Sequence, residues 1–150
     1  GTLEEAVTDS PLVTLITNST KAFLTGDMLA RGCHLNAMGA IVPSRAEFTE
    51  DVFDRADVIA VDSLRSVQDL STEFRNRFGT DEDGWDSVQT IASVIAADET
   101  RPDGADITLY KAMGMGLSDL ALAIEILERA QKAGRGHKVP DRVKLPPRLQ

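Results

Sequence analysis

Residues 31–47, RGCHLNAMGAIVPSRAE, constrain the fold most, because they join a strand pattern to a glycine and a proline-anchored polar loop. Residues 33–38 alternate as in a strand with two different faces. We expect Gly39 to end that strand, since glycine adopts backbone angles that other residues avoid, and Pro43 to fix an extended exit. Ligands of open α/β sheets bind beyond the carboxyl ends of strands, so chemistry is expected at this loop.

The rest of the sequence indicates strands that alternate with helices. Compact apolar or β-branched runs predict strands over residues 12–17, 58–61 and 107–110. Helices are predicted over residues 3–7, 23–29, 63–78, 85–96 and 117–133, with Ser63 as the cap of the third. A further helix is predicted from a Thr49 cap to residue 55. This order predicts an α/β fold with a parallel sheet and right-handed crossovers.

Three segments resemble one known family. HLNAMGAIVPSRAEF, from His34, resembles HxNAxGxDxPGKxEL, the signature of the ornithine cyclodeaminase and mu-crystallin family, although Arg45 stands where that signature has lysine. The signature residues in place are His34, Asn36, Ala37, Gly39, Pro43 and Glu47. Residues 60–63 resemble the family's VVDS strand end, and ITLYKAMGMGLSDLALAIEI, from Ile107, resembles ITVFKSxGxAxxDxxAA. Three ordered matches are more specific than any one short motif.

The resemblance implies a partial Rossmann-like parallel sheet of about four strands with flanking helices. Family chains carry a substrate and dimerisation domain, then a strand, a GxGxxG turn and a helix, and the matched segments follow that unit. The 150 residues contain no GxGxxG, since GMGLSD at residues 114–119 has only two glycines and follows the last strand. Residues 1–134 are therefore interpreted as the second half of an NAD(P)-binding domain with its closing helix, and residues 135–150 as a basic, proline-containing tail.

Four strand ends are expected to meet at one edge of the sheet, where small and polar groups suit a flat ring held against backbone. The resemblance implies NAD or NADP as the cofactor of the full-length protein. By this resemblance, the residues that lie against the nicotinamide half are Asn36, Ala37, Met38, Ala112 and Met113. The residues close to the ribose are those of the turn Thr17, Asn18 and Ser19. For Asn36 the alternative is a strand-end turn residue that satisfies local backbone.

Lys111, at the end of the last strand, is the catalytic candidate. It would face an anionic substrate or a cofactor phosphate, and a structural ion pair is an equally good interpretation. His34 is an acid-base candidate by residue type, but its place inside a strand favours a buried, hydrogen-bonded histidine. For Glu47 a loop ion pair is the favoured interpretation.

Ile41 departs from the family pattern, which has here an aspartate thought to act on the amino acid in cyclodeaminases and a serine in mu-crystallin. Isoleucine cannot transfer a proton or bind an ammonium group, so strict ornithine cyclodeamination is not expected. The resemblance then implies a catalytically incomplete piece of an NAD(P)-dependent oxidoreductase that acts on an amino acid or cyclic imine by hydride transfer. The alternatives are a non-catalytic, mu-crystallin-like protein that binds a nucleotide or small ligand, and a plain α/β interaction module.

The net charge of −8 is unevenly distributed and excludes some partners. Residues 129–150 hold seven lysines and arginines and one aspartate, a balance of +6, so the first 128 residues carry −14. A body this acidic is not expected to bind nucleic acid. No apolar run approaches the roughly 20 residues that cross a membrane, so no membrane partner is expected. The single cysteine, Cys33, excludes an internal disulfide and fits a cytoplasmic protein.

No metal site is expected, because TDEDG from Thr80 lacks the spacing of an EF-hand and no histidine-cysteine cluster is present. The last helix is apolar at residues 117, 120, 121, 124 and 127, and also at 122, 123 and 126. A helix that is apolar most of the way round needs cover on two sides. We therefore infer a second packing partner, either a missing domain or another subunit, and expect a homodimer for the full-length protein.

Overall fold

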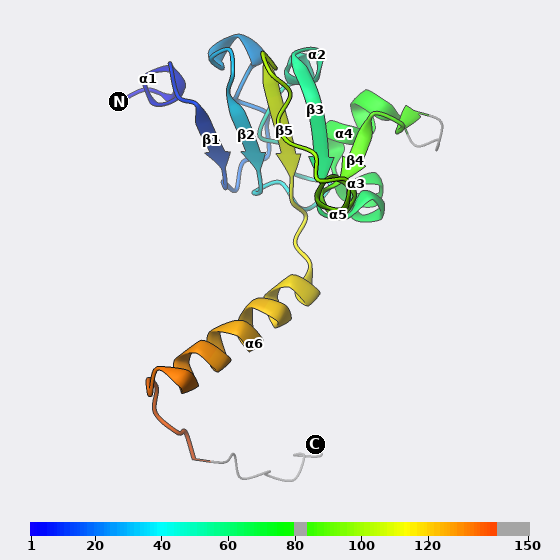
Figure 1. The fold of residues 1–150 in the computed structure, drawn as a ribbon. Coiled ribbons are helices and arrows are strands. Elements are labelled where there is room, and N and C mark those ends of the chain that lie inside the picture. Colours follow the sequence, from blue (N-terminus) through cyan, green and yellow to red (C-terminus); the bar gives the residue numbers. More distant parts are fainter. Residues whose placement is uncertain (80–83, 141–150) are drawn as a thin grey trace, which may run out of the picture. The chain divides into compact units, whose positions relative to one another are not determined.

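The computed structural model describes residues 1–79 and 84–140, and the chain forms two compact units. The first unit, residues 1–115, contains a five-stranded sheet of order β1-β2-β5-β3-β4. The strands are β1 (Leu12–Leu15), β2 (His34–Ala37), β3 (Ala56–Val61), β4 (Val88–Thr90) and β5 (Ile107–Lys111). All neighbouring strands pair in parallel, so their carboxyl ends meet at one edge (Figure 1). This confirms the predicted α/β fold class.

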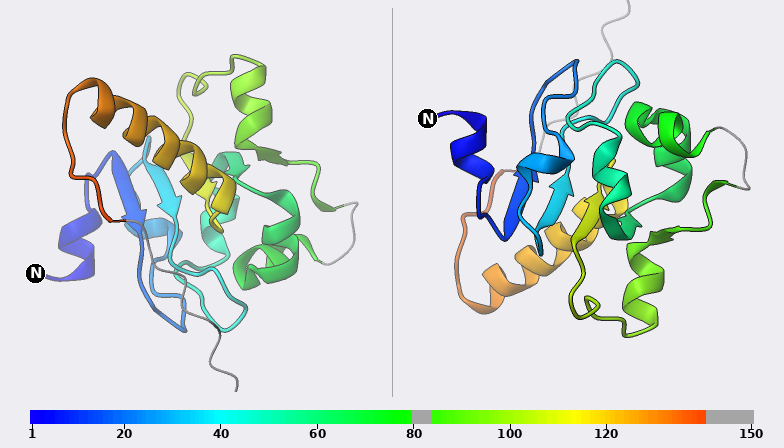
Figure 2. Two further views of the ribbon diagram at one scale, coloured as in Figure 1. Left: turned by 90° about the horizontal axis from the view of Figure 1, so that it is seen from below. Right: turned by 90° about the horizontal axis from the view of Figure 1, so that it is seen from above.

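Short helices cover both faces of the sheet. They are α1 (Leu3–Val7), the 3-10 helix η1 (Gly26–Met28), α2 (Asp51–Asp54), α3 (Leu64–Leu70), α4 (Thr72–Phe78) and α5 (Ile91–Ala96). The two views of Figure 2 place α2, α3 and α4 on one face of the sheet and α5 on the opposite face. This two-sided arrangement is typical of parallel sheets, which are buried by the helices that connect their strands.

The core lies between the sheet and the helices α2, α3 and α4. Alternate residues of β1 and β2, such as Val13 and Leu35, are buried and belong to one hydrophobic cluster with Phe53 of α2, Val67 of α3 and Phe74 of α4. The alternation follows from strand geometry, which points successive side chains to opposite faces. The other face of β1 and β2 is more open, and Leu12 there is 57% exposed.

The strand β4 was not predicted. A single helix was predicted over residues 85–96, but residues 88–90 pair with β3 and only Ile91–Ala96 are helical. Thr90 ends the strand and caps α5, because its Oγ1 accepts a hydrogen bond from the Ser93 amide at 3.1 Å. A three-residue edge strand has too short a pattern to compete with the helical periodicity that follows it.

The predicted helix over residues 63–78 is two helices. Ser63 caps α3 as predicted, since its Oγ accepts from the Ser66 amide at 3.3 Å. Ser71 then breaks the run with extended backbone angles, φ −83° and ψ 113°, before α4 begins. The break turns α4 away from α3 and buries Glu73 in its first turn.

Two further helix predictions were wrong in detail. Residues 23–29 form no α-helix: Leu24 makes an isolated bridge with Phe48, and only η1 is helical. Thr49 does not cap α2, whose cap is Glu50; the Thr49 hydroxyl instead donates to the carbonyl of Leu24 at 3.1 Å. Pairing between distant segments therefore takes precedence over local helix signals in this part of the chain.

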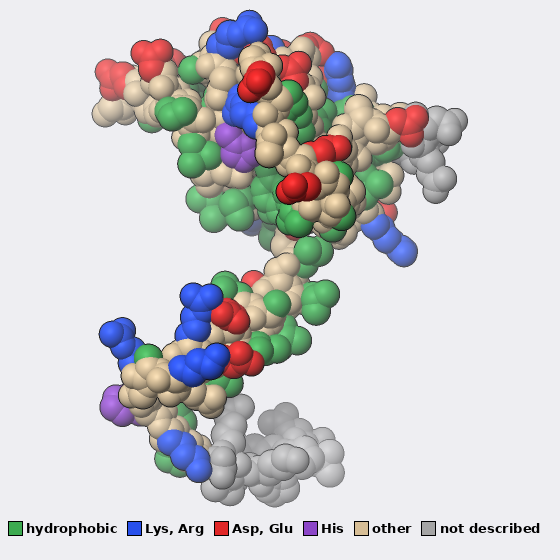
Figure 3. Space-filling model, viewed as in Figure 1, with side chains coloured by type: hydrophobic (Ala, Val, Ile, Leu, Met, Phe, Trp, Pro, Cys, Tyr) green, Lys and Arg blue, Asp and Glu red, His purple; other side chains and the backbone are tan. Residues whose placement is uncertain are grey.

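The second unit begins at Gly116 and contains α6 (Gly116–Lys132), close to the predicted range. Its apolar side chains are exposed over much of the helix surface, with Leu117 at 75% and Leu122 at 60% (Figure 3). An ion pair joins Glu125 to Arg129 one turn later, at 2.6 Å.

Two sequence expectations concern membranes and metals. In the part of the chain that the structure describes, no helix is long and apolar enough to span a membrane. Among the same residues, no group of three or more histidine, cysteine or carboxylate side chains is arranged to hold a metal ion. The TDEDG segment examined for calcium falls largely on residues 80–83, outside the described residues.

Candidate functional site

Three segments that carry the family resemblance meet at the carboxyl edge of the sheet. Ala37, Lys111 and Val61 are aligned across β2, β5 and β3, and Leu15 of β1 is aligned with Ala37. The pairing continues past the strands, since the Met38 amide donates to Leu15 at 2.8 Å and the Ala112 amide to Ala37 at 3.1 Å. The structure therefore brings the predicted cofactor-binding segments side by side.

The residues predicted to contact the nicotinamide half differ in accessibility. Met38 is 39% exposed, whereas Ala37 is fully buried and Ala112 and Met113 are 8% exposed. Met113 also uses its amide, which donates to the Asp62 carboxylate at 2.9 Å. Met38 can therefore present its side chain to a ligand, whereas the side chain of Ala37 is part of the hydrophobic core and Ala112 is buried.

Asn36 lies in a row of polar side chains across the open face of the sheet. Its Nδ2 donates to Thr14 Oγ1 at 3.3 Å, and its Oδ1 lies 3.1 Å from Nε2 of His34. The other ring nitrogen of His34, Nδ1, lies 2.7 Å from Thr108 Oγ1. His34 is hydrogen-bonded as predicted but only half-buried. The side-chain partners of Asn36 are thus side chains of neighbouring residues and not turn backbone.

The turn predicted to lie near the ribose follows β1. Thr17 donates through its amide and its hydroxyl to Glu47 Oε1, at 2.6 and 2.8 Å. Ser19 donates its amide to the Thr17 hydroxyl at 3.2 Å and its own hydroxyl to the carbonyl of Lys21 at 2.6 Å. Asn18 is exposed between them. Glu47 therefore fixes the base of this turn, and Asn18 lies at its surface.

Lys111, the predicted catalytic residue, is fully buried. Its Nζ donates to the carbonyl of Ala40 at 2.7 Å and lies 3.5 Å from Glu73 Oε2. Burial lowers the pKa of Lys111, and the nearby carboxylates of Glu73 and Glu47 oppose that shift. These contacts are those of a structural ion pair, the second of the two interpretations that the sequence allowed for Lys111. A catalytic role for Lys111 stays a prediction.

Sequence reasoning missed Glu73 altogether. Its burial depends on the break at Ser71 and on packing against residues far away in the chain, and a glutamate in a polar helical run carries no signal of either. Asp62 was placed at the edge without a role. Its Oδ2 accepts from the amides of Met113 and Gly114, at 2.9 and 2.8 Å, and so holds the segment after β5 against the end of β3.

Apolar side chains are exposed at the same edge. Ile41, at the position where the signature has aspartate, is 40% exposed, and Val42 beside it is 38% exposed. Ile16, next to Met38 in the register of β1 and β2, is 72% exposed. No carboxylate replaces the signature aspartate at Ile41 itself.

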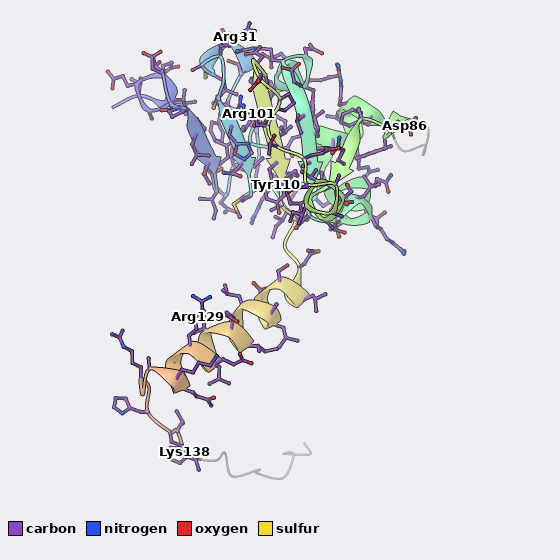
Figure 4. The ribbon with its side chains drawn as sticks, viewed as in Figure 1. Arg31, Asp86, Arg101, Tyr110, Arg129 and Lys138 are labelled. Carbon is purple, nitrogen blue, oxygen red and sulfur yellow. The ribbon has the colours of Figure 1, made fainter. Side chains whose placement is uncertain are left out.

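A cavity of about 630 Å³ lies on the open face of the sheet, beside α5. Arg101 and Tyr110, labelled in Figure 4, belong to its lining together with His34 and Thr108. Burial raises the pKa of Tyr110, and the charge of Asp62 acts in the same direction. None of the residues predicted to bind the cofactor lines this cavity, but His34, which does, lies 3.1 Å from Asn36.

Known proteins resemble this chain in fold and sequence. A solved structure of an archaeal alanine dehydrogenase dimer with bound NAD matches with a TM-score of 0.75 at 27% identity, over 93% of this chain and 43% of that one. Delta(1)-pyrroline-2-carboxylate reductase of Bacillus cereus is 25% identical over 140 residues, 90% of this chain and 42% of that protein. Ketimine reductase mu-crystallin of Mus musculus is 28% identical over 124 residues, 82% of this chain and 37% of that protein.

The chain spans about two fifths of the length of these curated relatives. The sequence profile of one family matches residues 1–134, a range that contains the three segments at the strand ends. The chain therefore belongs to the ornithine cyclodeaminase/mu-crystallin family.

Proposed function

We propose that this chain is part of an NAD(P)-dependent oxidoreductase that transfers hydride to or from a cyclic imine or an amino acid. The observation that supports the proposal most is the meeting of three family segments, at the ends of β2, β3 and β5, at one carboxyl edge of a parallel sheet. The proposal is supported by relatives that are named as a Delta(1)-pyrroline-2-carboxylate reductase and an alanine dehydrogenase with bound NAD. When bound, the cofactor would supply the hydride for imine reduction or accept it in amino acid oxidation, and the protein would orient the cofactor against the substrate.

The edge fits the nicotinamide half of a dinucleotide. Ala37 and Ala112 carry small side chains there, which suits a flat ring held against backbone, and Met38 supplies an exposed apolar side chain. The residues that would hold this half are Asn36, Ala37, Met38, Ala112 and Met113, and the ribose would lie near Thr17, Asn18 and Ser19. The pyrophosphate needs a glycine-rich turn that these 150 residues do not contain, so the complete site requires further residues.

Ile41 limits the reactions that the site could catalyse. A side chain without an ionisable group can neither carry a proton nor pair with a substrate ammonium group. The protein is therefore proposed to be an imine reductase or an amino acid dehydrogenase, and not an ornithine cyclodeaminase. In such an enzyme, a residue other than Ile41 would transfer the proton. The exposed isoleucine also favours one alternative, a mu-crystallin-like protein that binds a nucleotide or small ligand without turnover. Either protein is expected to be a homodimer at full length.

The test is an assay of the protein at its full encoded length. Oxidation of NADH and of NADPH would be followed with Δ1-pyrroline-2-carboxylate and other cyclic imines, and the reverse reaction with L-proline and L-alanine. Turnover with any of these pairs supports the oxidoreductase. Dinucleotide binding without turnover favours the alternative, and the absence of dinucleotide binding refutes both.

Ile41→Asp in the full-length protein is expected to change turnover of amino acids and to leave cofactor affinity unchanged. The new carboxylate would meet the substrate ammonium group and not the dinucleotide. Val42→Asp is the matched control, because Val42 is equally exposed on the same loop. A change in cofactor affinity with no change in amino acid turnover would contradict the assignment of Ile41 to the substrate side.

A further inference from the structure

A single buried carboxylate joins the two loops that follow β1 and β2. Glu47 is fully buried, and each of its two carboxylate oxygens accepts two hydrogen bonds. Oε1 accepts from the amide and hydroxyl of Thr17, and Oε2 accepts from the amides of Gly39 and Ala40, at 2.8 and 3.2 Å. All four donors belong to residues just past the ends of β1 and β2, so the Glu47 side chain sets the distance between the two loops.

Glycine at position 39 allows this close approach. A Cβ at Gly39 would overlap the backbone of Thr17 and the carboxylate of Glu47. The backbone of Gly39 is not among the left-handed residues, so its requirement is for space alone. The loops are thus packed against each other at backbone contact, with the Glu47 carboxylate between them.

Lys111 and Glu73 complete the network from the opposite side. The Glu47 amide donates to Glu73 Oε1 at 2.8 Å, and the other oxygen of Glu73 accepts from the Ser71 hydroxyl at 3.0 Å and faces Lys111. Ala40 is consequently held at both ends, through its amide by Glu47 and through its carbonyl by Lys111. Ala40 directly precedes Ile41, the residue proposed to face the substrate.

Buried ion pairs contribute little net stability to a fold, because apolar residues of similar volume often stabilise it as much or more. A network of two carboxylates and one ammonium group does offer directional bonds, which hold a loop in one geometry. We infer that Glu47, Glu73 and Lys111 are positioning residues that hold the strand-end loops in the geometry that the nicotinamide half of the cofactor requires. This inference rests on the proposed function.

The test compares Glu47→Gln with Glu50→Gln in the full-length protein. Glutamine at position 47 must turn its NH2 group toward two donors whichever way the amide points, because each Glu47 oxygen already accepts two hydrogen bonds. Glu50 is exposed beside Arg77, so the same chemical change there leaves the loops alone. The probes are NADH and ADP, which lacks the nicotinamide ring and the ribose that carries it.

Glu47→Gln is expected to weaken NADH binding by about tenfold or more and ADP binding by less than about twofold. Glu50→Gln is expected to change neither affinity. Equal losses for both ligands in Glu47→Gln would mean a general structural role and would overturn the inference, as would no loss at all. If Glu47→Gln does not fold, Glu73→Gln replaces it, because that change keeps an acceptor for the Glu47 amide; the same expectations apply.

Failure of the proposed function gives a different result, since the wild-type protein would then bind neither ligand. In that case, amide hydrogen exchange of the 150-residue chain and its Glu47→Gln variant tests whether Glu47 holds the two loops in place. Faster exchange of the Gly39 and Ala40 amides in the variant, with the Leu35 and Leu109 amides unchanged, supports the positioning network. Unchanged exchange at Gly39 and Ala40 overturns it.

Discussion

Two glycines lie just beyond the carboxyl ends of β2 and β5, and the structure gives each a different reason for lacking a side chain. Gly114 has φ +86°, a left-handed conformation, with nothing within 4 Å of an added Cβ. Gly39 has no such angle but also no space. The sequence correctly marked Gly39 as the end of a strand, but the predicted reason, an unusual backbone angle, was wrong.

Gly39→Ala is expected to lower the free energy of unfolding by about 3 kcal/mol, because backbone and a buried carboxylate must move to admit the methyl group. Gly114→Ala is expected to cost about 1 kcal/mol, the strain of a left-handed alanine. Urea denaturation of both variants measures the difference. Equal losses would show that the two loops at Gly39 have room to separate.

Arg55 and Asp106 form a bidentate pair between the end of α2 and the start of β5. Arg55 donates through Nε and Nη2 to the two Asp106 oxygens, at 2.9 and 2.8 Å. The hydrogen bond from Arg55 holds the pKa of Asp106 below its usual 3.8. The unfolded state therefore binds the proton first as pH falls, and the pair's contribution to stability is present above pH 3.8 and lost below it.

Asp106→Asn is expected to reduce the loss of stability between neutral and acid pH, because the variant has no carboxylate to protonate at this position. Thermal unfolding midpoints across that range measure the slope. Asp103→Asn, at an exposed neighbour, is the control and is expected to keep the wild-type slope. A wild-type slope in Asp106→Asn would contradict the pairing with Arg55.

At the scale of elements, an aromatic cluster joins α2 to α4. Phe74 of α4 is fully buried and meets Phe53 of α2 edge to face, with ring centroids 4.9 Å apart. Phe78 and Trp85 pack against the ring of Phe74. The cluster holds α4 at the angle that points Glu73 toward Lys111.

Phe74→Ala is expected to lower the free energy of unfolding by about 3–5 kcal/mol, the usual result of removing a fully buried aromatic ring. Urea denaturation followed by circular dichroism gives the value. Leu70→Ala, at a position 38% exposed on α3, is the control and should cost less than about 1 kcal/mol. A small loss for Phe74→Ala would show that α4 is not anchored through this ring.

The predicted elements succeeded where a pattern is local and long enough. β1, β2, β3 and β5 follow from apolar or alternating runs, and α6 from its spacing of apolar residues. β4 was missed because Val88 is held in it by pairing with β3, a partner distant in sequence. At the break, the Ser71 hydroxyl donates to Glu73, two residues later, and a serine in a polar helical run carries no signal of a break.

At the scale of the whole molecule, the 150 residues contain the loops proposed to hold one half of a dinucleotide and no glycine-rich turn for the pyrophosphate. Its affinity for NADH is expected to be at least about 100-fold weaker than that of the full-length protein, since backbone amides at a helix start supply much of the phosphate binding. Calorimetry on both proteins measures the ratio. Tight binding by the short chain would show that the strand-end loops suffice.

The exposed apolar surface of α6 belongs to the same scale. Side chains on opposite sides of the helix, such as Ile124 at 50% and Ile126 at 57%, are exposed. The inference of a second packing partner, drawn from the apolar spacing alone, stays a prediction, and so does the division into a domain over residues 1–134 and a tail.

Local composition was enough to predict the class of fold, four of the five strands and the edge at which family segments meet, because strand patterns and strand-end glycines act over a few neighbouring residues. The burial and pairing of the charged residues depend on the tertiary structure. Glu47 and Glu73 are 26 residues apart, and Lys111 is 71 residues from the Ala40 carbonyl that it binds. Burial of a charge depends on such distant partners, and no local pattern carries that information.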